Sequence, residues 1–203
     1  MLIPEETFTA GNGKPLEIRS VTAEYALQLA QHRTATSRET YFMARYPEEC
    51  RIDLAELSET VQCLEDSETE FAVTAFDGET IVGDLCVRHI SSHIKTRHRY
   101  GLGISIRQEF CGLGLGSRML QIAVETARKN GIEQLELGVF ADNPRAIALY
   151  EKYGFKEWGR QPHAFKLKDG TYRDEIMMVL FLDQAKGDGM TLLTHDTKLK
   201  ITR

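Results

Sequence analysis

The chain has 203 residues, of which 42% are hydrophobic and 27% are charged, and its formal net charge is −5. This composition excludes wholesale disorder, and the length suits a single globular domain with a substantial core. The negative net charge does not favour nucleic acid as a partner, because such proteins usually bind through an overall positive field.

The N-terminus and the cysteines indicate the compartment. Residues 1–6 lack the basic start and apolar run of a secretory signal, and no stretch approaches the roughly 20 apolar residues of a membrane span. We therefore expect a soluble, cytoplasmic protein without a membrane partner. Its cysteines should stay reduced there, since none forms a Cys-x-x-Cys pair. They are Cys50, Cys63, Cys86 and Cys111.

The first part of the chain predicts a flexible lead-in over residues 1–15, a half-buried strand over 16–21, and helices over 23–35 and 53–64. For the first helix, Thr22 is the expected N-cap, and Leu27 and Ala30 are expected on the inward face.

From residue 71 onward, strands and helices alternate. The predicted strands cover 71–76, 80–87, 100–106, 134–140, 157–167 and 172–182, and the predicted helices cover 116–129 and 143–153. Asp77-Gly78 is a strong turn signal between the first two of these strands, and Asn130-Gly131 should end a helix. The order predicts a mixed-sheet α/β domain with helices on both faces, over residues 16–183. Residues 184–203 are expected to form an appended tail.

A glycine-rich turn joins the strand at 100–106 to the following helix. It reads Cys111-Gly112-Leu113-Gly114-Leu115-Gly116. The free N–H groups and positive dipole end of a helix N-terminus attract phosphate, and glycines let the backbone approach an anion closely. The candidate donors are the backbone amides of Leu113, Gly114, Leu115, Gly116 and Ser117.

Two other interpretations of this turn stay open. It could be a tight connection that merely needs glycine. It could also be the dinucleotide fingerprint Gly-x-Gly-x-x-Gly, but the spacing here is Gly-x-Gly-x-Gly. The fingerprint also expects an acidic residue at the end of the next strand, whereas Glu136 falls in the middle of the predicted strand.

The helix at 143–153 carries a tyrosine in line with its cap. Asn143 is a favoured N-cap and Pro144 a favoured first residue, while Gly154 suits the C-terminal end. Asn143 and Tyr150 are two helical turns apart and share one face, so a ligand along this face could meet both. The alternative is that Asn143 only caps and Tyr150 only packs in the core.

Residues 101–155 resemble the central motifs of the GNAT superfamily, the Gcn5-related N-acetyltransferases. The helix matches the family pattern Asn-x-x-Ala-x-x-Leu-Tyr-x-x-x-Gly-Phe position for position, and the ending Asp169-Gly170-x-Tyr172-x-Asp174-Glu175-x-Met177 is similar to bacterial small-molecule and ribosomal-protein members. The resemblance covers about residues 16–182. It implies a twisted, mostly antiparallel sheet of about seven strands.

The resemblance also implies an activity and a site. The glycine turn would hold the pyrophosphate of acetyl-CoA, the co-substrate. Its pantetheine arm would pair with residues 103–107, where Ile104 and Ile106 are candidate contacts. Tyr150 would be the catalytic acid that protonates the leaving thiolate, and Asn143 a cofactor contact. The acceptor would be a primary amine of a small molecule or a protein N-terminus, and the chain could form a homodimer, as relatives commonly do. The alternative is a non-catalytic acyl-CoA-binding module.

Three points are left open by this comparison. Cys111 occupies the position where the family pattern has Arg or Gln; it is either a small filler or a thiol whose pKa is lowered by the helix N-terminus. The general base is either Glu136 or a water relay. The basic segment 87–99 is either a solvated hairpin or an attractor for an acidic substrate or a CoA phosphate, and His89 and His93 in it do not have the helical context of a metal pair.

Overall fold

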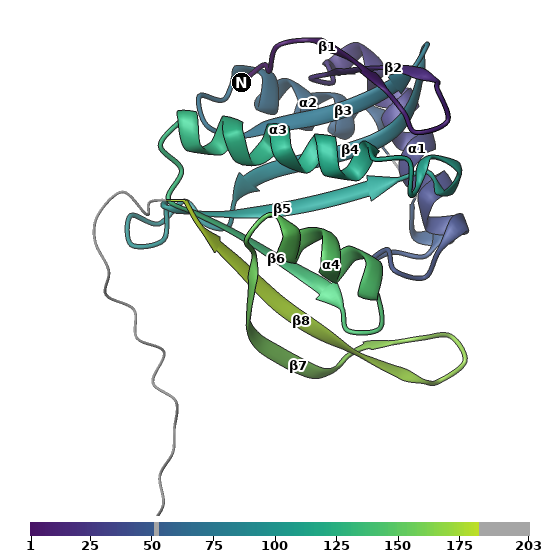
Figure 1. The fold of residues 1–203 in the computed structure, drawn as a ribbon, viewed down its shortest axis with the longest axis vertical. Helices are drawn as coiled ribbons and strands as arrows, with labels where there is room; N and C mark the ends of the chain where they lie inside the picture. Colours follow the sequence, from purple (N-terminus) through teal and green to yellow (C-terminus); the bar gives the residue numbers. More distant parts are fainter. Residues whose placement is uncertain (51–52, 183–203) are drawn as a thin grey trace, which may run out of the picture.

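The computed structural model describes residues 1–50 and 53–182, which form one mixed sheet with helices packed on it (Figure 1). The strands are β1 (Glu6–Thr9), β2 (Pro15–Arg19), β3 (Phe71–Asp77), β4 (Thr80–His89), β5 (Arg99–Ile106), β6 (Gln134–Phe140), β7 (Lys156–Lys166) and β8 (Tyr172–Phe181). The helices are α1 (Ala26–Glu39), α2 (Leu54–Asp66), α3 (Leu115–Lys129) and α4 (Pro144–Lys152).

The strands form a single sheet in the order β1-β2-β3-β4-β5-β6-β8-β7. Only β5 and β6 pair in parallel, and every other neighbouring pair is antiparallel. The predicted α/β class with a mostly antiparallel sheet is therefore confirmed. The sheet has eight strands, one more than expected.

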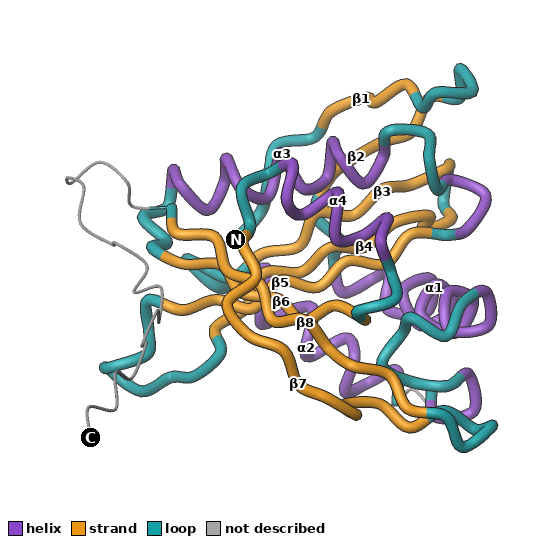
Figure 2. The backbone as a smooth tube through the Cα atoms, turned by 60° about the horizontal axis from the view of Figure 1, so that its bottom comes forward, coloured by secondary structure: helices purple, strands orange, loops and turns teal. Residues whose placement is uncertain are grey.

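The helices cover both faces of the sheet, as predicted. Figure 2 shows α3 and α4 on one side and α1 and α2 on the other. The larger core lies under α3 and α4, and a smaller core lies between the sheet and the pair α1 and α2. The side chains of α3 that face the sheet are buried: Leu120, Ala123, Val124 and Ala127.

The extra strand comes from the segment expected to be a flexible lead-in. Residues 6–9 pair with β2 and form the edge strand β1. Arg118 on α3 forms an ion pair with Glu6, with 2.6 Å between Arg118 Nε and Glu6 Oε1. The lead-in prediction is wrong because this strand is short and polar, and its stability depends on partners distant in the sequence.

The first helix also differs from the prediction. A short 3-10 turn (Ala23–Tyr25) precedes α1, and Thr22 makes no side-chain capping bond. The Thr22 hydroxyl bonds to the Glu24 carboxylate instead, at 3.0 Å. Leu27 is 51% exposed rather than inward, whereas Ala30 is buried as expected. The 3-10 turn shifts the phase of the helix, so periodicity counted from residue 23 selects the wrong face.

The local turn predictions fare better, because they depend on backbone preferences. Gly78 and Gly131 both have left-handed φ angles, 58° and 70°. Asn143 caps α4 by accepting a hydrogen bond from the amide of Ala146 at 3.1 Å. The last predicted helix and its cap are thus confirmed to within one residue at each end.

The parallel strands β5 and β6 separate partway along their length. Their register covers only Arg99 to Gly101 on β5 and Gln134 to Glu136 on β6. Both strands continue, β5 to Ile106 and β6 to Phe140, and Figure 1 shows them diverging toward the N-terminal ends of α3 and α4. We call the gap between these unpaired halves the β5–β6 opening.

Two further expectations concern the C-terminal tail and a membrane span. The expected tail, residues 184–203, lies outside the described residues. No helix within the described residues combines the length and the apolar character needed to cross a lipid bilayer.

Candidate active site

The edge of β5 at the β5–β6 opening presents backbone groups that pair with no neighbouring strand. The amide of Arg107 donates to Val82 on β4 at 2.9 Å, which fixes which residues of β5 face β4. Because the hydrogen-bonding direction alternates along an antiparallel strand, the amides and carbonyls of Ile104 and Ile106 face the opening. This edge can pair with an extended ligand that carries amide groups.

The glycine turn lies at the end of this edge. Gly112 and Gly114 have φ angles of 83° and 88°, a region that side chains disfavour. Gly114 is the N-cap of α3 and offers no side-chain cap. The amides of residues 113–117 donate to no other group within the described residues. A helix N-terminus with five such free donors is an anion-binding arrangement.

Neighbouring elements hold this turn in place. The amide of Gly11, in the loop between β1 and β2, donates to the carbonyl of Leu113 at 2.9 Å. The hydroxyl of Tyr153, the residue that follows α4, donates to the carbonyl of Ser117 at 2.6 Å. At Gly116 a Cβ would lie 3.1 Å from Ile106 and 3.3 Å from Leu149, so this glycine allows α3 to pack closely on β5 and α4.

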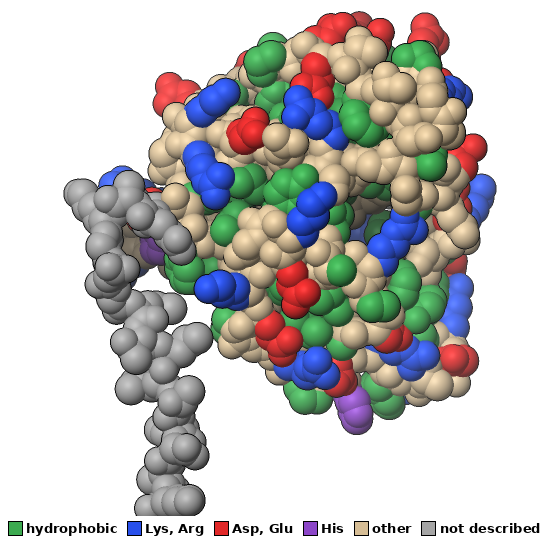
Figure 3. Space-filling view, viewed as in Figure 1, with side chains coloured by type: hydrophobic (Ala, Val, Ile, Leu, Met, Phe, Trp, Pro, Cys, Tyr) green, Lys and Arg blue, Asp and Glu red, His purple; other side chains and the backbone are tan. Residues whose placement is uncertain are grey.

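Arg145, in the first turn of α4, is a candidate site residue that sequence reasoning missed. Its Nη2 atom lies 3.0 Å from the position that a Cβ on Gly112 would occupy, so the guanidinium lies over the glycine turn. Its side chain is exposed and forms no ion pair within the described residues. Figure 3 shows the surface hollowed between the N-terminal ends of α3 and α4, with a cationic side chain at the rim. The signal in the sequence was its place two residues after the cap Asn143.

Cys111 does not behave as a reactive thiol. It is half-buried, and its Sγ lies 3.8 Å from the carbonyl oxygen of Ile106. Burial raises the pKa of the Cys111 thiol, while the nearby guanidinium of Arg145 lowers it by less. Of the two alternatives for Cys111, the thiol with a lowered pKa is not supported, because desolvation outweighs the favourable charge of Arg145.

Tyr150 lies on the buried side of α4. Its side chain is 7% exposed and packs with Phe155, with 5.9 Å between the ring centroids. Its hydroxyl has no hydrogen-bond partner within the described residues. Burial raises the pKa of Tyr150 to about 12. The phenol therefore keeps its proton at neutral pH and can act as a proton donor.

Two of the sequence candidates lie away from the opening. Glu136 is opposite Gly101, where β5 and β6 are still paired, and its carboxylate is buried in an ion pair with Arg99. The prediction of Glu136 as a base is therefore not supported. The basic loop before β5 lies at the other end of that strand from the glycine turn, so it does not reach the candidate phosphate site.

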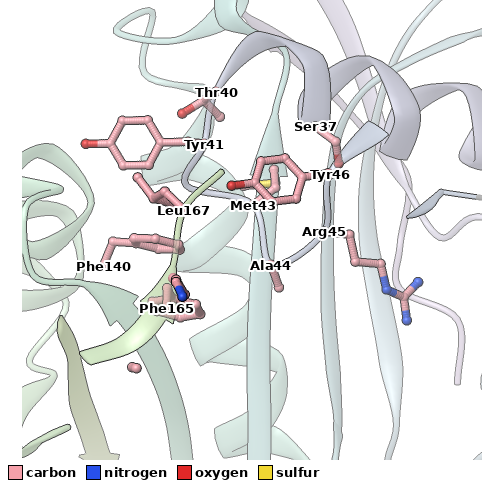
Figure 4. A pocket seen from close by; sticks show the side chains of 12 residues that line it. Ser37, Thr40, Tyr41, Met43, Ala44, Arg45, Tyr46, Phe140, Phe165 and Leu167 are labelled. Atoms are coloured by element: carbon pink, nitrogen blue, oxygen red, sulfur yellow. The ribbon is translucent and has the colours of Figure 1, made fainter. Parts of the chain in front are cut away.

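A pocket of about 200 Å³ lies on the α1 side of the sheet, beside the end of β6. Figure 4 shows Phe140 and Phe165 on one wall and Tyr41 and Tyr46 from the loop after α1. The Phe140 and Phe165 rings stack, with 3.9 Å between centroids. The guanidinium of Arg45 points away from these rings (Figure 4). The pocket therefore suits an apolar group.

The residues at the opening fit the two ends of acetyl-CoA. The free edge of β5 matches an extended arm with amide groups, and the uncapped glycine turn with Arg145 matches a diphosphate. Among the residues that the structure describes, no three His, Cys, Asp or Glu side chains gather in a way that could hold a metal ion. The geometry is that of a protein that binds an extended, anionic ligand across a gap in its sheet.

The sequence matches a known family over the same region. The model of the acetyltransferase (GNAT) family matches residues 27–155, which is more than half of the chain. The chain therefore belongs to the GNAT acetyltransferase family. This family uses acetyl-CoA.

Solved structures of this family share the fold. A GNAT acetyltransferase from Streptococcus pneumoniae is 26% identical, with a TM-score of 0.77 over 82% of this chain and 98% of that chain. A phosphinothricin acetyltransferase from Sinorhizobium meliloti, solved in complex with acetyl-CoA, has a TM-score of 0.73 over 95% of this chain and 98% of that chain. At 18% identity, the second likeness concerns the fold alone.

Curated relatives match over a shorter stretch. The ribosomal protein bS18-alanine N-acetyltransferase of Escherichia coli is 35% identical over 77 residues, 38% of this chain and 51% of the relative. An L-amino acid N-acetyltransferase of the same species is 29% identical over 107 residues, 52% of this chain and 64% of the relative. The chain spans about half the length of the curated relatives it matches.

Proposed function

We propose that this chain is an N-acetyltransferase that moves the acetyl group of acetyl-CoA onto a primary amine of a small molecule or of a protein N-terminus. The observation that carries the proposal is the β5–β6 opening, which combines an unpaired strand edge with an uncapped helix N-terminus. Bound acetyl-CoA would supply an activated thioester.

The chain's own residues would bind and orient this co-substrate in two places. The backbone of Ile104 and Ile106 would pair with its amide-bearing arm, and the amides of residues 113–117 would bind its diphosphate with help from Arg145. Backbone pairing of this kind fixes an extended chain along its whole length, so that the reacting carbon is held beside the strand.

Tyr150 is the proposed catalytic acid. Its hydroxyl would donate a proton to the leaving sulfur atom, which needs one once the thioester bond breaks. Because burial raises the pKa of Tyr150 to about 12, the phenol stays protonated across the physiological range and the proton is present for donation.

The aromatic pocket is the proposed site for the acceptor. Its volume of about 200 Å³ accommodates one amino-acid-sized group, and its stacked rings favour an apolar one. This supports a small amine with an apolar part, or the first residue of a peptide. Phe165→Ala should raise the KM for the acceptor and leave the KM for acetyl-CoA unchanged.

The test is release of free thiol from acetyl-CoA across a panel of amino acids, polyamines, aminoglycosides and N-terminal peptides, with the product identified by mass spectrometry. Acetylated amine and thiol in equal amounts would support the proposal. Tight CoA binding without transfer to any amine would indicate a non-catalytic acyl-CoA-binding module instead.

A further inference from the structure

A buried histidine and a serine form a hydrogen-bonded pair between α1 and β5. His32 is 2% exposed. Its Nδ1 lies 3.1 Å from the carbonyl oxygen of Ile81, and its Nε2 lies 2.9 Å from the hydroxyl oxygen of Ser105. Since a carbonyl oxygen can only accept, Nδ1 carries the proton of the neutral ring. Nε2 is then the acceptor, and the Ser105 hydroxyl donates to it.

Ser105 is on the part of β5 that has left β6. Leu102, Ile104 and Ile106 pack on the α3 side of the sheet, so the side chains between them face α1. Gly103 is exposed on this α1 face, and a Cβ there would meet no atom within 4 Å. The sheet is thus open beside Ser105, next to the free edge of β5.

A free carboxylate lies on the other side of the opening. The Glu175 carboxylate of β8 occupies the space that a Cβ on Gly138 of β6 would fill. Gly138 faces α1, because its neighbours Leu137 and Val139 are in the core under α3 and α4. Glu175 has no hydrogen bond or ion pair within the described residues. An ammonium group entering here would meet a negative charge on one wall and Ser105 on the other.

We propose that Ser105 takes a proton from the acceptor amine and passes its own hydroxyl proton to Nε2 of His32, so that this pair is the base of the transfer reaction. The inference rests on the proposed function. Ser105 is the catalytic residue in this scheme, and His32 is a positioning residue that acts through it.

The protons and bonds of the step balance. As the amine nitrogen bonds to the acetyl carbon, its N–H becomes acidic, so that a weak base suffices. That proton goes to the Ser105 oxygen, and the serine proton goes to His32, which becomes an imidazolium while Nδ1–H stays bonded to Ile81. The imidazolium returns its proton to water through Ser105 after the product leaves. Tyr150 separately supplies the proton of the thiol and regains one from water, and the acceptor attacks as its neutral amine, after its ammonium proton has gone to water.

The surroundings of His32 keep it neutral at neutral pH. Burial lowers its pKa from 6.5, and Arg107, beyond the end of β5, lowers it further. Asp84 on β4 and the bond to Ile81 act in the opposite direction but do not cancel the desolvation. Arg107 is itself paired with Glu39 of α1 at 2.7 Å. The base is therefore available above its lowered pKa and is lost as the pH falls through that value.

The test uses the full chain and five variants, of which Glu175→Gln serves the pH profile. Ser105→Ala and His32→Gln should each lower kcat about 10²-fold, the lower end of the range for general base catalysis, with the KM for acetyl-CoA unchanged. Ser105→Thr, which keeps the hydroxyl, should recover most of the rate. Thr36→Val is the matched control, because Thr36 is equally buried on α1 and its hydroxyl bonds only to the backbone carbonyls of His32 and Arg33.

Two readouts separate catalysis from folding. In a plot of kcat/KM against pH, the wild-type value should fall as the pH drops below 6.5. This acid limb of the profile should be absent in His32→Gln. In the unliganded protein, ¹⁵N NMR should show Nδ1 protonated and Nε2 free at neutral pH, and Ser105→Ala should shift the Nε2 resonance only.

Other outcomes overturn the inference. Wild-type rates in Ser105→Ala, an Nε2 that carries a proton at neutral pH, or an acid limb that moves with Glu175→Gln but not with His32→Gln would each exclude His32 as the base. These results would leave the proposed function intact if the wild type transfers acetyl groups. A wild type that binds acetyl-CoA without transferring its acetyl group would refute both.

Discussion

Arg145 provides the most direct test of the proposed phosphate site. Replacing it with Gln removes a guanidinium that lies over the glycine turn but keeps an uncharged polar side chain in the first turn of α4. A charge-assisted hydrogen bond contributes about 1.5–3 kcal/mol when it is sheltered from solvent. Arg145 is exposed, so we expect a smaller contribution, about 1 kcal/mol. That corresponds to about a 5-fold weaker Kd for CoA at low salt.

The assay is titration calorimetry of CoA at about 50 mM and about 300 mM salt. The difference between wild type and Arg145→Gln should shrink at the higher salt, because an exposed charge is screened beyond a Debye length of less than about 10 Å. Acetylated pantetheine, which lacks the nucleotide diphosphate, should bind both proteins equally, since it reaches only the edge of β5.

Arg128→Gln is the matched control. Arg128 is an exposed arginine in the last turn of α3, at the opposite end from the glycine turn, and its loss changes the net charge by the same amount. If Arg145→Gln and Arg128→Gln have the same Kd for CoA at low salt, the effect is one of overall charge. The placement of the phosphates at the glycine turn would then lose the support of Arg145.

Three further predictions concern single residues of the site. Tyr150→Phe should lower kcat about 10²–10⁴-fold without changing the Kd of CoA, and an unchanged rate would exclude Tyr150 as the acid. Because burial raises the pKa of Tyr150 to about 12, the phenol stays protonated as the pH rises toward that value, so its ionisation should not lower the wild-type kcat below it. Gly114→Ala should destabilise the protein by about 1–2 kcal/mol in chemical denaturation, because φ is 88° there, whereas Gly159→Ala, with open space and an ordinary φ, should cost less. Cys111 should react with iodoacetamide more slowly than the exposed Cys63 at neutral pH, because burial raises the pKa of Cys111; equal labelling rates in a mass-spectrometric time course would contradict this.

The parts of the site that the sequence predicted are those set by local backbone chemistry. The glycines of the turn and the Asn143 cap act within a few residues, and the structure places each of them at a helix end. The strand predicted at residues 100–106 is likewise present as β5, Arg99–Ile106. Such signals survive because they depend little on what the rest of the chain does.

The parts that the sequence missed depend on contacts between distant residues. Arg145 lies over Gly112 only because α4 packs beside the start of α3, and His32 meets Ser105 only because α1 crosses β4 and β5. Neither residue stands in a motif. The edge strand β1 was missed for the same reason, since its ladder to β2 and its ion pair to α3 are both tertiary.

The departure at Cys111 has a physical explanation in this arrangement. A long polar side chain at that position would extend from the loop toward the proposed phosphate site, and here the half-buried thiol bonds toward Ile106 instead. The positive charge over the turn comes from α4, through Arg145. A helix holds its side chain with fewer backbone conformations than a loop does, so the cation is positioned at a lower entropic cost. The family motif is incomplete in the sequence, but the charge it provides is present in the fold.

The two-residue period of β5 explains how one strand can serve several purposes at once. Its backbone groups at Ile104 and Ile106 face the opening, the side chains of the same residues anchor the strand in the core under α3, and Ser105 between them faces α1. A shift of one residue in the pairing of β5 with β4 would exchange these directions. It would turn Ser105 away from His32 and bury polar atoms under α3. The antiparallel register with β4, which runs from His89 to Gly83, therefore fixes which groups of β5 face the opening.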